Sequence, residues 1–121
     1  EIGYAYLDYF STHGIGESEG SQIKQLLEGG KAREALRAMG LAAIEMCRSQ
    51  YLVLGEKRYA YGVEGEKMVS EFRTNAGGDE NASLLRVSEL VERGAFVPAL
   101  ERLGRIINAV ESAKEAYPHL F

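Results

Sequence analysis

The apolar residues of this chain recur mostly at steps of three and four, which is the spacing of one face of an α-helix. The clearest stripe runs from residue 32 to residue 47. Alternating strand-like runs are scarce, and the only prolines are Pro98 and Pro118. The pattern therefore predicts an all-α fold, a compact bundle of four or five antiparallel helices that forms a single domain over residues 1–121.

The same pattern predicts where the helices begin and end. We expect helical segments at about residues 2–12, 18–28, 32–73, 80–93 and 96–117, with an interruption of the third at Gly55. Residues 74–79 form the clearest loop, and Asp79 or Asn81 is placed to cap the helix that follows. Pro98 falls in a first helical turn, where its missing N–H is harmless.

A short motif occurs twice, 64 residues apart, so that Gly30 of the first copy corresponds to Gly94 of the second. In each copy a helix end and a glycine turn are followed by Ala-Leu: Ala35 and Leu36 in the first, Ala99 and Leu100 in the second. The repeat predicts two helical hairpins, at about residues 18–54 and 80–117. Gly40 and Gly104 recur at matched places inside the second helices, where we expect close approach of two helix backbones.

The glycine turn followed by alanine five residues later resembles the tetratricopeptide hairpin, and Phe96 supplies the aromatic often found between the two. This resemblance implies a helical hairpin that binds other proteins. The first-helix aromatic pattern of that family is missing, and the 64-residue spacing is longer than its repeat of ~34 residues.

The leucine pair before the first turn, together with Ala35 and the small residues Ala42 and Ala43, resembles HEPN-type helical bundles. The nuclease members of that family carry an arginine four to six residues before a histidine. His13 and His119 have no arginine at that distance before them. The resemblance therefore implies a bundle without the family's RNase activity.

Residues that could perform chemistry are few and scattered. The chain has one cysteine, Cys47, and two histidines, so we expect neither a zinc site nor an internal disulfide. Cys47 falls on the apolar stripe, which favours a buried, inert thiol over a nucleophile. We expect no catalytic residues, no metal and no cofactor. An enzyme or cofactor binder that uses a cavity between helices is the third hypothesis for this chain.

The net charge and the hydropathy of the chain disfavour some classes of partner. The chain has 14 basic and 18 acidic side chains and a net charge of -4, which disfavours a general electrostatic grip on nucleic acid or an anionic membrane. No apolar run reaches the ~18 residues of a membrane span, and no signal peptide is recognisable. A single free cysteine is typical of a reducing compartment. We therefore expect a cytoplasmic protein without a membrane partner.

Tyrosine and basic side chains gather between residues 48 and 61. Tyrosine joins an apolar ring to a polar tip, which suits an interface. We predict a patch that binds a protein partner or, through aromatic stacking and positive charge, RNA. The alternative is that these tyrosines lie at the boundary of the core, beside charged side chains that face solvent. The predicted patch consists of Arg48, Tyr51, Lys57, Arg58, Tyr59 and Tyr61.

The preferred hypothesis is a non-enzymatic helical protein–protein interaction or scaffolding module. Its partner is another protein or a second copy of the chain, giving a homo-oligomer. The alternative hypothesis is a HEPN-like bundle that binds nucleic acid or acts in a toxin–antitoxin or defence complex. Nucleic acid is not the favoured partner because of the acidic net charge.

Overall fold

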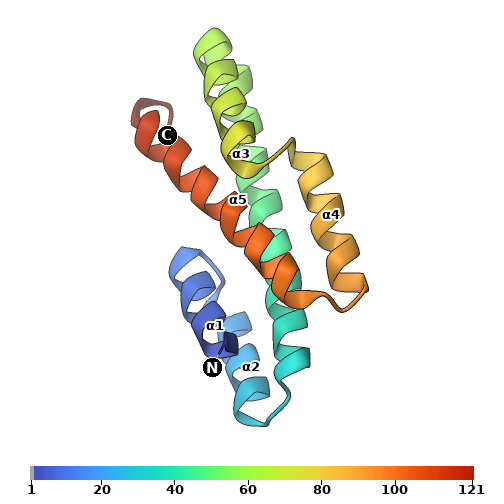
Figure 1. Cartoon of the computed structure of the whole chain (residues 1–121). Helices are drawn as coiled ribbons and strands as arrows, with labels where there is room; N and C mark the ends of the chain where they lie inside the picture. Colours follow the sequence, from blue (N-terminus) through green and yellow to red (C-terminus); the bar gives the residue numbers. More distant parts are fainter. Residues whose placement is uncertain (1) are drawn as a thin grey trace.

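The computed structural model describes residues 2–121, and the elements in that range confirm the predicted all-α fold. The five α-helices of this range are α1 (Ile2–His13), α2 (Glu17–Glu28), α3 (Ala32–Ala76), α4 (Glu80–Glu92) and α5 (Phe96–Ala116). A 3-10 helix, η1 (Pro118–Leu120), follows, and residues 2–121 contain no strand. In Figure 1, α5 runs diagonally across α3, with α1 and α2 on one side and α4 on the other.

The two predicted hairpins turn in the same way. Gly30, between α2 and α3, and Gly94, between α4 and α5, both have a φ of 76°, a left-handed conformation that favours glycine. Each glycine N–H donates to the carbonyl three residues earlier, and the next N–H donates to the carbonyl five residues earlier. This pair of bonds is the Schellman motif, which satisfies carbonyls left open at a helix end. The sequence repeat is therefore also a repeat of backbone geometry.

The hairpin turns also contact each other. The guanidinium of Arg33, at the start of α3, lies 5.0 Å from the centroid of the Phe96 ring at the start of α5. Gly40 of α3 packs against α4, because a methyl group at Gly40 would lie 3.2 Å from Val91 Cγ2. At Gly104 the neighbour is the ring of Tyr9, at 3.8 Å. Both glycines thus mark helix contacts, but side chains rather than backbones meet them.

Helix α3 is bent back on itself at Gly62, which has the non-helical angles φ 57° and ψ -122°. Residues 32–61 form a first arm and residues 63–76 a second arm that returns beside it (Figure 1). The backbones of the two arms touch at Gly65, where a methyl group would lie 2.6 Å from the Lys57 carbonyl oxygen. The interruption predicted at Gly55 is wrong: the helix continues through Gly55 and reverses seven residues later.

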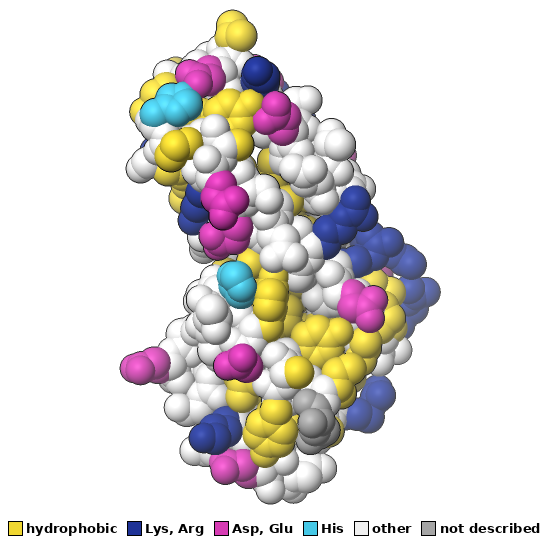
Figure 2. All heavy atoms as spheres, turned by 60° about the vertical axis from the view of Figure 1, so that its left-hand side comes forward, with side chains coloured by type: hydrophobic (Ala, Val, Ile, Leu, Met, Phe, Trp, Pro, Cys, Tyr) yellow, Lys and Arg dark blue, Asp and Glu magenta, His cyan; other side chains and the backbone are white. Residues whose placement is uncertain are grey.

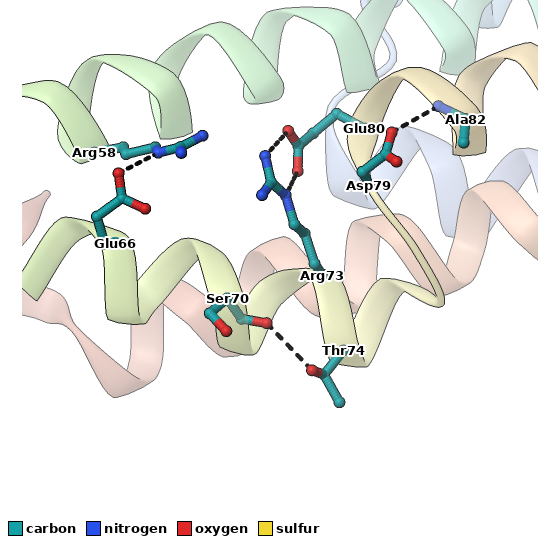
Figure 3. Close-up of polar contacts among 8 residues, drawn as sticks. All are labelled: Arg58, Glu66, Ser70, Arg73, Thr74, Asp79, Glu80 and Ala82. Carbon is teal, nitrogen blue, oxygen red and sulfur yellow. Dashed lines mark hydrogen bonds and ion pairs between the residues drawn. The ribbon is translucent and has the colours of Figure 1, made fainter.

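Polar contacts join the two ends of the second arm to neighbouring helical segments (Figure 3). Arg58 Nε on the first arm donates to Glu66 Oε1 on the second at 2.6 Å. Arg73 makes two hydrogen bonds to the Glu80 carboxylate, at 2.7 and 2.9 Å, and so joins the second arm to α4. Asp79, one of the two caps predicted, caps α4 by accepting from the Ala82 N–H. The loop between these helices is therefore held by charge-assisted hydrogen bonds.

A single cluster of buried side chains draws on all five helices and η1. Its largest fully buried members include Phe10 of α1, Phe72 of α3 and Leu100 of α5. Helices α3 and α5 lie at the centre of the molecule, so the other helices pack around this pair (Figure 1). Within residues 2–121, no helix combines the length and the apolar character that crossing a membrane requires.

Candidate interaction surfaces

The predicted patch is divided between two sides of the first arm of α3, as three of its six residues show: Arg48, Tyr51 and Tyr59. Arg48 and Tyr59 point outward, where Arg48 pairs with Glu45 and Tyr59 is 93% exposed. Tyr51 turns inward and packs its ring edge against Phe72 on the second arm, with 5.7 Å between the ring centroids. Tyr51 is therefore part of the contact between the two arms and not of an open surface.

The other three predicted residues also have separate surroundings. Arg58 is bound to Glu66, as described above. The Lys57 ammonium lies 5.8 Å from the ring centroid of Phe121 at the chain end, and Tyr61 is 45% exposed at the end of the first arm. The six residues share one helix but do not form one patch, because residues close in sequence point in different directions around a helix.

A groove of about 710 Å³ runs between α1 and α5. Its walls are mainly apolar, with Tyr6, Tyr9 and Phe10 on α1 facing Leu100 and Ala109 on α5. Figure 2 turns this side of the molecule forward and shows hydrophobic side chains gathered along its lower half, with basic side chains at one edge. The groove is therefore shaped to receive an apolar group between two helices.

Polar groups close one part of this groove. Tyr9 donates a hydrogen bond to Asn108 Oδ1 at 2.7 Å, and the Gly104 carbonyl oxygen lies 3.2 Å from the same hydroxyl. Burial, followed by the nearby Glu111 carboxylate, raises the pKa of Tyr9, so this hydroxyl stays a neutral donor. The prediction of a partner-binding patch did not include the groove. The signal for it in the sequence was the crowding of tyrosines in the first helical segment.

Two tyrosine-to-phenylalanine substitutions should have opposite effects on stability. The Tyr51 hydroxyl is buried without a hydrogen-bond partner among residues 2–121. Tyr51→Phe should therefore leave the free energy of unfolding unchanged or raise it by up to about 1 kcal/mol, whereas Tyr9→Phe should lower it by about 1 kcal/mol. Urea unfolding of both variants tests this. A clear loss of stability in Tyr51→Phe would mean that its hydroxyl has a partner in solution.

A second candidate surface lies on the outward side of the first arm of α3. We call it the outer ridge: Leu41, Glu45, Arg48, Leu52 and Tyr59, all exposed. These residues follow one another at steps of four, three, four and seven, so they share one face of the helix. Leu41 is 42% exposed and Leu52 is 70% exposed. Large exposed apolar side chains that share one helix face make this side of the arm a candidate contact surface.

The one thiol of the chain lies on the opposite face of the same arm. Cys47 is 1% exposed, and this burial raises its pKa from 9.0 to about 12. A thiol in this state is a poor nucleophile. Within residues 2–121, no three His, Cys, Asp or Glu side chains are grouped closely enough to hold a metal ion.

Burial of Cys47 should make the fold less stable in alkali. The folded chain keeps the thiol proton to about pH 12, while the unfolded chain releases it near pH 9. The stabilisation is thus complete below pH 9 and falls as the pH rises towards 12. Urea unfolding at a series of pH values should show a steeper loss in the wild type than in Cys47→Ala. Equal slopes in the two proteins would contradict the assignment.

Comparison of the chain with protein-family models, with curated proteins and with solved structures gives no match. The resemblances to tetratricopeptide hairpins and to HEPN bundles therefore stay predictions from the sequence. The class that the structure defines is an all-α bundle of helical hairpins with one long bent helix.

Proposed function

We propose that this protein is a non-enzymatic helical interaction module that binds another polypeptide. The observation that carries the proposal is the outer ridge, where Leu52 and Tyr59 are 70% and 93% exposed on one face of a regular helix. A helix that presents side chains at steps of three and four suits a partner helix. Burial of these side chains in a complex would remove apolar surface from water, which favours association.

The charges near the outer ridge favour a protein partner over nucleic acid. Arg48 pairs with Glu45, and Arg58 pairs with Glu66. Binding to nucleic acid draws most of its free energy from basic side chains that neutralise phosphates. Basic side chains that already face a carboxylate contribute less to such binding, and the net charge of the chain is -4.

Substitutions on the outer ridge test the proposal. The purified protein should appear by light scattering and native mass spectrometry as an assembly with itself or with a second polypeptide. Leu52→Ser combined with Tyr59→Ser should abolish that assembly while circular dichroism stays helical. Leu85→Ser is the matched control, because Leu85 is a 62% exposed leucine that belongs to α4 and not to the outer ridge.

Two results would contradict the proposed function. The first is a monomer that carries a small molecule or a metal ion and no polypeptide. The second is salt-sensitive binding to single-stranded RNA that weakens in Lys57→Glu and Arg58→Glu, because that result favours the nucleic-acid alternative.

A further inference from the structure

The outer ridge has the spacing of a helix that pairs with another helix. Leu41 to Glu45 and Arg48 to Leu52 are steps of four, and Glu45 to Arg48 is a step of three. Alternating steps of three and four place side chains along the seam between two packed helices. From residue 34 to residue 59 the regular arm is about 39 Å long at ~1.5 Å per residue. The arm is long enough for several layers of paired side chains.

We propose that the outer ridge binds the outer ridge of a second copy of this chain, with the two arms antiparallel. This inference rests on the proposed function and names its partner. The two-fold axis passes between the levels of Met46 and Cys47. Leu41 then faces the partner's Leu52, and Glu45 faces the partner's Arg48. Two-fold symmetry repeats both contacts, so one dimer contains two leucine pairs and two opposite-charge pairs.

The charges of the outer ridge select this arrangement over its alternatives. A parallel pair would place Glu45 against the partner's Glu45 and Arg48 against the partner's Arg48, and like charges in contact oppose association. Sliding one antiparallel copy by seven residues would place Arg48 against the partner's Leu52 and Glu45 against the partner's Gly55. The Glu45–Arg48 pair of each chain would then be buried against uncharged residues, which costs desolvation without adding an opposite charge. Of these arrangements, only the proposed one pairs every charge with its opposite and every leucine with leucine.

The shape of the molecule fits the same arrangement. Helix α4 covers the lower part of the arm, from Gly40, which contacts Val91, to Tyr51, which lies near the start of α4. Beyond that level, Figure 1 shows α3 projecting past α1, α2 and α4. In an antiparallel dimer each projecting end lies along the wider part of the other copy. The most exposed residues of the outer ridge, Leu52 and Tyr59, are then covered by the partner.

Exchanging charges between two variants tests the pairing directly. Glu45→Arg leaves two positive charges at the centre of the outer ridge, and Arg48→Glu leaves two negative charges. Each variant alone should dissociate, with a dissociation constant raised on the order of 100-fold. An equimolar mixture should form a heterodimer, because every facing pair is again of opposite charge. The double variant Glu45→Arg with Arg48→Glu should dimerise by itself.

The matched control is Arg86→Glu on α4, because Arg86 and Glu89 form another exposed pair with the same spacing. This variant should keep the wild-type dissociation constant, measured by sedimentation equilibrium. Circular dichroism of every variant should show an unchanged helix content, so that dissociation is not confused with unfolding.

Three results would overturn the dimer. One is a wild type that stays monomeric at millimolar concentration; if it binds a different polypeptide that Leu52→Ser releases, the proposed function stands while the second copy is excluded. Another is dimerisation that survives in both single variants, which would place the interface elsewhere. The last is a mixture of dissociated single variants that fails to form the heterodimer, which would exclude this pairing of charges.

Discussion

Replacing Phe10 with alanine is expected to lower the free energy of unfolding by about 3–5 kcal/mol. Phe10 is 0% exposed and is the main residue through which α1 enters the core. Its ring lies edge-on to Tyr9, with centroids 5.2 Å apart, and stacks on Tyr6 at 6.2 Å. The truncation would therefore leave a cavity beneath α1 and remove a wall of the groove between α1 and α5.

Tyr4→Ala is the control for this prediction. Tyr4 is also an aromatic residue on α1, but it is 40% exposed. Its replacement should change the free energy of unfolding by no more than about 0.5 kcal/mol. Urea unfolding at one fixed protein concentration compares the two variants. Similar small losses in both would mean that α1 is not anchored through Phe10.

Gly65→Ala should also destabilise the fold strongly, lowering the free energy of unfolding by about 2–3 kcal/mol. A methyl group at this position would lie 2.6 Å from the Lys57 carbonyl oxygen and 2.7 Å from Arg58 Cα. Both atoms belong to the backbone of the first arm, so no side-chain rotation relieves the contact. The two arms of α3 would have to separate, which would weaken the packing of Tyr51 on Phe72.

Gly20→Ala provides the comparison, because Gly20 is another glycine inside a helix. A methyl group there would meet Ser11 Oγ at 3.6 Å, an ordinary contact. Alanine is the better helix former by ~1 kcal/mol, so this variant should be as stable as the wild type or more stable. Thermal unfolding of Gly65→Ala and Gly20→Ala separates the effect of the backbone contact from the effect of helix propensity. A Gly65→Ala protein with raised stability would show that the arms are not in contact there.

Gly65 also affects the proposed dimer. The outer ridge lies on the first arm, and the second arm supports that arm from its inner side through Tyr51 and Arg58. If the arms separate, the projecting end of the first arm loses this support. Gly65→Ala should therefore weaken dimerisation as well, although it changes no residue of the outer ridge.

Local features of the chain were predictable from its sequence. The helices, the turns at Gly30 and Gly94 and the cap at Asp79 depend on residues only a few positions apart. Helical spacing, the left-handed freedom of glycine and the side-chain acceptor of a cap act over that short range. The burial of Cys47 was predictable for the same reason, because its place on the apolar stripe follows from helical spacing.

The bend of α3 was not predictable in this way. Gly55 and Gly62 both interrupt a helical pattern in the sequence, yet only Gly62 leaves the helix. The reversal at Gly62 brings Gly65 against Lys57 and Phe72 against Tyr51, which buries the second arm on the first. Contacts across the bend decide between the two glycines, and such contacts follow from packing rather than from local preference.

The sequence by itself determined an all-α chain with two similar hairpins and with tyrosines and basic residues between positions 48 and 61. The tertiary structure decided which of these residues face solvent: Tyr59 is on the outer ridge, while Tyr51 is enclosed between the arms. It also created the groove, in which Tyr9 meets Asn108 from far along the chain. Both results depend on how helices pack, because a surface is formed by whichever faces the buried contacts leave open.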